Sequence, residues 1–140
     1  MSTETNKAIV RRYHEQVWNE RRRELFAEFV AENVVPHGTP GGPGLEGLKQ
    51  GFDMAVNAFP NAQQTIEDVI AEGDKVVVRW MARASHQGEL MGIPGTGQQV
   101  TLSGVTIYRL ADARIVEMWY HPDNLSLMQQ LGVIPTPETA

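Results

Sequence analysis

The spacing of the apolar residues changes at Pro60, and this change favours a fold in which helices come first and strands follow. Before Pro60, apolar side chains recur every three or four residues over 6–19, 23–30 and 45–58, which predicts three amphipathic helices. After Pro60 they alternate, which predicts long strands over 63–71, 75–87, 99–110 and 114–120. Helical spacing returns after Pro122 and predicts a closing helix.

The turns join these strands in sequence order. Gly73-Asp74 and residues 111–113 read as tight reversals, and residues 91–97 form a longer turn. A short extended piece ends at Pro36-His37, before a loop rich in glycine and proline at 38–44. We therefore predict an α+β domain, with three N-terminal helices packed on the concave face of a curved antiparallel sheet and a pocket between the two layers.

Composition limits the classes of partner. The 140 residues are 41% apolar and 21% charged, as expected of one globular domain over 1–140. A net charge of −5 without a basic stripe argues against nucleic acid or membrane as a partner. The absence of cysteine excludes disulfides and thiolate chemistry. A polar N-terminus, and no apolar run near the ~20 residues that span a bilayer, lead us to expect a cytoplasmic protein.

One carboxylate stands at the last strand-to-helix junction. Asp123 follows Pro122 and lies near His121 and Trp119, where it could remove a proton from a carbon acid, and burial against Trp119 would raise its pKa. The alternative is an N-cap of the closing helix, whose N-terminus would lower the pKa. A carboxylate bonded to the amide of Ser126 or Leu125 and pointing away from any pocket would be a cap, and the catalytic role would then be withdrawn.

The histidines and two aromatic residues are the other candidates for a site. His86 ends the apolar face of its strand and is either a donor to a substrate carbonyl or a core histidine. Tyr13 and Trp80 combine an apolar body with one polar tip, which suits a pocket lining. We expect His14 to be exposed, because it lies one position off the helix stripe. No histidine spacing matches a zinc motif, so a metal site would need distant residues to converge.

Several short motifs resemble a known family when taken in order. The chain over roughly 6–132 is similar to the SnoaL-like polyketide cyclases, within the cone folds of the nuclear-transport-factor-like and ketosteroid-isomerase-like superfamily. The resemblance rests on Trp18-Asn19, His37-Gly38, Phe59-Pro60, residues 72–80, Ser85-His86-Gln87-Gly88, residues 92–97, Ser103-Gly104, residues 115–119, Asp123 and residues 130–132.

The resemblance implies an enzyme without metal or organic cofactor that closes a ring by intramolecular aldol addition. Asp123 matches the acid–base residue of the family, and Arg109 stands where we align a histidine of those enzymes. On this hypothesis His86 and Arg109 stabilise an enolate oxygen of a hydrophobic carbonyl substrate. The binding residues would be Tyr13, His37, Trp80, Trp119 and His121.

The same fold leaves other functions open. An isomerase, a dehydratase or a hydrolase could use the same pocket, and so could a small-molecule-binding module without chemistry. Cone-fold relatives commonly pair through the convex face of the sheet, where Val77, Arg79 and Met81 alternate in this chain. We therefore predict a homodimer.

Overall fold

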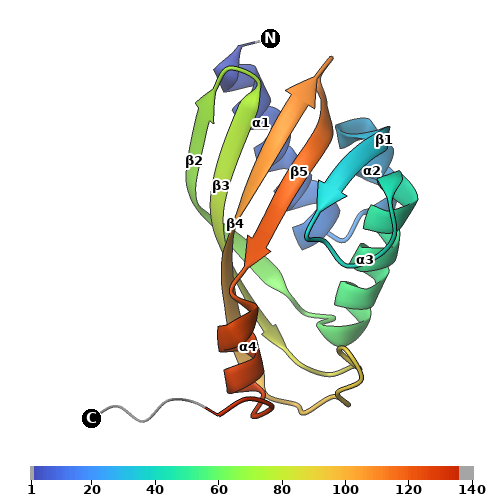
Figure 1. The fold of residues 1–140 in the computed structure, drawn as a ribbon, viewed down its shortest axis with the longest axis vertical. Coiled ribbons are helices and arrows are strands. Elements are labelled where there is room, and N and C mark those ends of the chain that lie inside the picture. The colour runs from blue at the N-terminus through green and yellow to red at the C-terminus, as the bar shows by residue number, and fades with distance from the viewer. Residues whose placement is uncertain (1, 136–140) are drawn as a thin grey trace.

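The computed structural model describes residues 2–135, with helices and one mixed sheet (Figure 1). Four helical segments precede the first strand, one helix lies between the first and second strands, and one short helix follows the last strand. In chain order the elements are α1 (Thr3–Arg12), the π-helix η1 (Tyr13–Asn19), the 3₁₀ turn η2 (Arg23–Leu25), α2 (Phe26–Phe29), β1 (Val30–His37), α3 (Gly44–Ala58), β2 (Gln63–Glu72), β3 (Lys75–Ser85), β4 (Gln99–Ala111), β5 (Arg114–Pro122) and α4 (Asn124–Gln130).

The sheet has five strands in the order β1-β5-β4-β3-β2. The four strands after Pro60 form the expected antiparallel meander, and the reversals at Gly73-Asp74 and Asp112-Ala113 are where the sequence placed them. The fifth strand is β1, which contains the predicted extended piece and pairs with β5 in parallel. A parallel edge strand was not foreseen, because only the antiparallel turns leave a local signal.

The helices and the sheet enclose one main core, and Figure 1 shows α1 behind the strands. Its fully buried members come from both layers, which confirms the predicted α+β arrangement with helices on the concave side. The predicted helix over 23–30 is shorter than expected, because Val30 already begins β1. The fully buried apolar residues of this core include Val10, Val17, Phe26, Val76, Val78 and Ile115.

The first helix changes geometry partway along. After Arg12 the chain continues as a π-helix from Tyr13 to Asn19, which has more residues per turn than an α-helix. The wider turn shifts the angular position of every later side chain. His14, however, is only the second residue of this segment and comes four residues after the buried Val10, so ordinary helical spacing already places it on the inward face. It is buried, with 4% of its surface exposed, and our expectation of an exposed His14 was wrong.

A β-bulge in β5 decides which side chains face inward. Arg109 pairs with Glu117 but Leu110 pairs with Ile115, so Val116 is an extra residue on β5. Since one added residue exchanges the two faces of a strand, Met118 and Tyr120 lie on the inner face after the bulge, with Tyr108 and Thr106 opposite them. Trp119 falls on the outer face.

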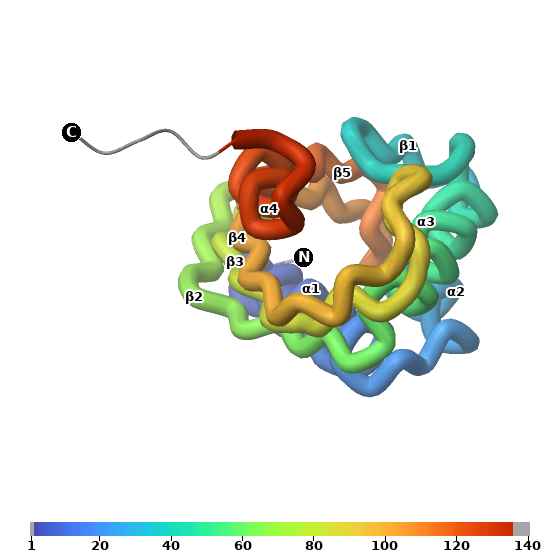
Figure 2. The backbone as a smooth tube through the Cα atoms, turned by 90° about the horizontal axis from the view of Figure 1, so that it is seen from below, coloured from blue at the N-terminus to red at the C-terminus, as the bar shows by residue number. Residues whose placement is uncertain are grey.

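The end of the molecule near α4 contains a second apolar cluster, which we call the mouth cluster. Figure 2 shows α4, the loop between β3 and β4, and the segment joining β1 to α3 arranged around this end. Gln130 of α4 exchanges hydrogen bonds with the backbone of Thr101, so α4 continues along the edge of β4 where β5 stops. The mouth cluster comprises Ala84, Val100, Leu127, Met128 and Leu131, with Phe59, Ala62, Leu90, Ile93 and Leu102 packed against it.

Within residues 2–135, none of the helices combines the length and the apolar character that crossing a bilayer requires.

Candidate functional site

The inner face of the sheet carries a few polar atoms in an aromatic setting. Trp80 Nε1 donates to Thr106 Oγ1 at 3.0 Å, and its ring stacks on Tyr120 with 5.9 Å between the centroids. Gly104 makes this stack possible, because a Cβ at that position would lie 2.5 Å from Trp80 Cζ2. Burial raises the pKa of Tyr120 to about 12, so its hydroxyl stays protonated at neutral pH.

A buried hydrogen-bond chain links α1 to the sheet deeper in the core. His14 Nδ1 donates to Gln64 Oε1 at 2.7 Å, and Nε2 accepts from the Tyr108 hydroxyl at 2.8 Å. Burial lowers the pKa of His14 to about 4 and raises the pKa of Tyr108 well above its ordinary value. Both groups are therefore neutral near pH 7. The adjacent Tyr13 is a core residue whose pKa burial raises to about 12.

Four of the predicted site residues lie together on the outer face instead. Arg109 Nε donates to Glu117 Oε1 at 3.0 Å, and Glu117 Oε2 lies 2.8 Å from His37 Nε2. His37 stacks on Trp119 at 5.3 Å between centroids, and His121 is exposed on the same strand face. The bonds from His37 and then Arg109 lower the pKa of Glu117. This outer group is separated from Trp80 by the sheet itself.

Asp123 is the N-cap residue of α4. Its Oδ1 accepts a hydrogen bond from the Ser126 amide at 3.1 Å, and its backbone nitrogen donates to the Ser103 carbonyl at 2.8 Å. The side chain is exposed, so it is not buried against Trp119 as the catalytic interpretation expected. The contact that defines the cap alternative is formed, and Asp123 acts as a cap in this conformation.

His86 is the most enclosed of the predicted site residues, with no exposed surface. Its Nδ1 accepts from the Thr96 amide at 3.3 Å and lies 3.1 Å from Thr96 Oγ1, while the ring packs 5.6 Å from Phe59. Its Nε2 is buried without a hydrogen-bond partner among residues 2–135. A buried polar nitrogen without a hydrogen-bond partner costs about 1–3 kcal/mol of folding stability, so its presence here needs an explanation.

The structure does not bring the three predicted catalytic residues together. Asp123 is bonded to Ser103, and Arg109 lies six positions further along β4, which is roughly 20 Å along the strand. Arg109 also lies on the outer face. His86 pairs with Gln98 beyond the other end of the same stretch of β4. Arg109 and His86 are therefore not placed to share one enolate oxygen next to Asp123.

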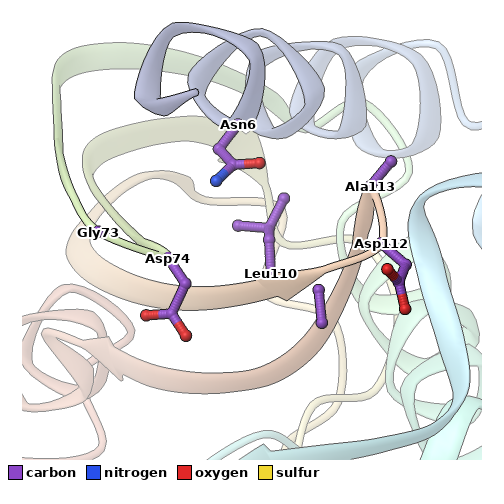
Figure 3. A pocket seen from close by; sticks show the side chains of 7 residues that line it. Asn6, Gly73, Asp74, Leu110, Asp112 and Ala113 are labelled. Carbon is purple, nitrogen blue, oxygen red and sulfur yellow. The ribbon is translucent and has the colours of Figure 1, made fainter. Parts of the chain in front are cut away.

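Two cavities lie at the end of the molecule opposite α4. The smaller, about 150 Å³, lies between α1 and the two hairpin turns, and Figure 3 shows Asn6 pointing between Asp74 and Asp112. It is below the roughly 300 Å³ at which small-molecule pockets begin. The larger is an open groove of about 460 Å³ that lies between α1, η1 and α2. Neither contains a predicted catalytic residue, and neither is the expected pocket on the inner face of the sheet.

Metal-binding side chains do not gather anywhere in the described part of the chain, where no three histidine, aspartate or glutamate residues are grouped to hold an ion.

The fold and the strand-to-helix junction define a class: a cone-shaped α+β domain whose sheet wraps around its helices. The chain matches the SnoaL-like polyketide cyclases over residues 8–131 and belongs to that family. It is 30% identical over 145 residues to the aklanonic acid methyl ester cyclase DnrD of Streptomyces peucetius, covering 99% of this chain and 97% of that protein. The corresponding cyclase DauD of Streptomyces sp. strain C5 is 30% identical over 137 residues, with 93% and 84% covered.

Solved structures agree with this family. IdmH of Streptomyces antibioticus is 31% identical and superposes with a TM-score of 0.79, covering 91% of this chain and 99% of IdmH. TsrD of Streptomyces laurentii shares the fold with a TM-score of 0.87 at 20% identity, covering 96% and 99% of the two chains.

Sequence reasoning missed the inner-face residues Thr106, Tyr108 and Tyr120. Alternation along β4 could have found Thr106 and Tyr108, since they alternate with Val105, Ile107 and Arg109 on the outer face. Tyr120 had no such signal, because the bulge at Val116 reverses the alternation within β5.

Proposed function

We propose that this protein is a cofactor-independent cyclase that closes a ring by intramolecular aldol addition in a hydrophobic polyketide ester, with Asp123 as the acid–base residue. The observation that carries the proposal is the match to the SnoaL-like polyketide cyclases over residues 8–131, together with two cyclases that act on aklanonic acid methyl ester. Asp123, at the junction of β5 and α4, is the residue to which the resemblance assigns the acid–base role. The Ser126 bond engages only Oδ1, and the proposal requires Oδ2 to face the bound substrate.

The environment of Asp123 limits which substrates it could deprotonate. Asp123 is exposed and is not enclosed in an apolar pocket, and a carboxylate is a modest base toward carbon acids. A carbon that lies between two carbonyl groups is acidic enough for such a base, whereas an isolated ketone is not. The proposed substrates are therefore 1,3-dicarbonyl compounds, and the cap bond on Oδ1 leaves Oδ2 for proton transfer.

The proposed reaction conserves atoms and charge. Oδ2 takes a proton from the carbon between two carbonyls, and the C–H electron pair becomes the enolate. The enolate carbon attacks a second carbonyl of the same molecule, forming a C–C bond and converting that C=O into an alkoxide. Asp123 returns its proton to the alkoxide, so the enzyme ends in its starting state.

Three substitutions at Asp123 separate the base from the cap. Asp123→Asn and Asp123→Ser keep a capping oxygen but remove the base, so we expect near wild-type stability and a fall in turnover of about 10²–10⁴-fold. Asp123→Ala removes both and should also cost about 1 kcal/mol of unfolding free energy. Turnover is measured as ring-closed product from aklanonic acid methyl ester, and stability by urea unfolding.

The capping contact itself favours one rival function, a small-molecule-binding module without turnover. In that case the wild type would bind the ester and release it unchanged. Wild-type turnover that Asp123→Ser retains in full would contradict the role of Asp123, and a wild type that forms no product would contradict the cyclase.

A further inference from the structure

The imidazole of His86 is held by one loop at one nitrogen and by nothing at the other. Thr96 contributes both its amide and its hydroxyl to Nδ1. The Thr96 hydroxyl oxygen in turn accepts from the Gln98 amide, which leaves the hydroxyl proton free for Nδ1. The loop is closed by hydrogen bonds from the His86 amide to Gln98 and from the Gly97 amide to His86. Nothing in residues 2–135 bonds to Nε2.

This arrangement fixes the tautomer. A backbone amide can only donate, so the Thr96 amide requires Nδ1 to be an acceptor. In the neutral imidazole the proton then resides on Nε2, which makes Nε2–H a donor that is buried and unpaired. A buried donor without a partner is rarely retained for stability, because an apolar side chain of the same shape would avoid the loss.

The position of His86 indicates which part of a ligand it could meet. Asp123 is bonded to Ser103 and His86 to Gln98, five residues apart along the chain that forms β4, which corresponds to roughly 17 Å. Even with the two side chains turned toward each other, about 10 Å remains between them. An oxygen held by His86 is therefore not the enolate oxygen formed at Asp123 but one at the far end of an extended ligand.

We propose that Nε2–H of His86 donates a hydrogen bond to a remote carbonyl or ester oxygen of an elongated substrate, with Thr96 as the positioning residue that sets the tautomer. The inference rests on the proposed cyclase function and adds the length and the second oxygen of its substrate. His86 adjoins the mouth cluster, through Phe59 against its ring and Ala84 two residues before it. Because Nε2 is enclosed in the free protein, the side chains around it move apart when the oxygen binds.

The tautomer is tested without substrate. Protein labelled with ¹⁵N in its histidines should show one buried imidazole with the proton on Nε2. Thr96→Val removes the hydroxyl but keeps the amide, so the Nε2–H form should persist with a weaker preference. Thr96→Ser should restore the wild-type spectrum, and Thr65→Val on the exposed surface of β2 should not change it. A proton on Nδ1 of His86 in the wild type would overturn the inference.

The hydrogen bond to ligand is tested by affinity. His86→Phe keeps an aromatic ring but lacks the donor, so the Kd for aklanonic acid methyl ester should rise about tenfold while kcat changes little. Thermal unfolding checks that this variant is folded, and Thr96→Val should raise the Kd by a smaller factor that Thr96→Ser reverses. An unchanged Kd in folded His86→Phe would overturn the inference while the cyclase stands. A wild type that neither binds nor converts the ester would overturn both, so the two failures are distinguishable.

Discussion

Glu117 receives side chains from two neighbouring strands. His37 reaches it from β1 and Arg109 from β4, so the carboxylate joins the parallel edge strand to the antiparallel meander. All three side chains are partly exposed, with 45%, 36% and 21% of the side-chain surface accessible for His37, Arg109 and Glu117. Solvent screens such exposed contacts, so their contribution to the stability of the fold is modest. That contribution requires Glu117 to be charged.

The lowered pKa of Glu117 predicts how its contribution varies with pH. Because the folded-state pKa lies below the ordinary 4.5, the ionised carboxylate stabilises the fold above that pH and loses this effect as pH falls through the folded-state value. Glu117→Gln should therefore lower the unfolding free energy at pH 7, and the difference from wild type should be smaller at pH 3. Urea unfolding at both pH values measures it, with the exposed Glu89→Gln as control. A difference of equal size at both pH values would contradict the assignment.

At the scale of elements, two local irregularities separate what the sequence predicts from what the chain forms. The spacing of apolar residues and the turn residues were sufficient to predict the four strands after Pro60, their order and the closing helix. The bulge at Val116 and the π-helix over Tyr13–Asn19 were not predictable, because each arises from packing between distant elements. The bulge has an effect on the site, because it moves Trp119 to the outer face.

The candidate site, too, could be predicted only where it depends on the pattern within one strand. The apolar face of β3 correctly grouped Trp80 with His86, since both are buried on the inner side. Whether Arg109 and Asp123 come close depended on pairing across three strands, which alternation within one strand does not reveal. The cap at Asp123 was one of two alternatives, and the Ser126 contact that defines it is formed.

The burial of His14 predicts how the stability of the fold changes at acid pH. With its pKa lowered from 6.5 to about 4 by burial, His14 resists protonation in the folded protein while the unfolded chain accepts the proton. Stability present above pH 6.5 should thus decline as pH falls to about 4, by on the order of 3 kcal/mol in all. His14→Gln cannot titrate, so its unfolding free energy should be flatter across this range.

A matched substitution isolates that effect. His121→Gln removes an exposed histidine and should leave the pH dependence of wild type in place. Identical slopes for wild type and His14→Gln between pH 6.5 and 4 would show that His14 is not the titrating group. Most of this pH range lies above that of Glu117, whose effect begins below its ordinary pKa of 4.5.

At the scale of the whole molecule, the two faces of the sheet differ in what covers them. The helices pack on the inner face, and Figure 1 shows α1 behind the strands. On the outer face Val77 pairs with Ile107, and Arg79 with Val105, next to Met81. The four apolar residues of this group are only half-buried in the single chain, and Arg79 lies among them. Uncovered apolar side chains mixed with an arginine are typical of a protein interface.

We therefore predict a homodimer through the outer face of β3 and β4. Sedimentation at micromolar concentration should give about twice the chain mass of 15.6 kDa. Met81→Lys places a charge within this surface and should shift the population toward monomer, because burying an unpaired charge is unfavourable. Met91→Lys makes the same change on the loop between β3 and β4, where the side chain is 70% exposed, and should leave the dimer intact. A wild type that sediments at 15.6 kDa would refute the dimer, and dissociation by Met91→Lys alone would place the interface at the α4 end instead.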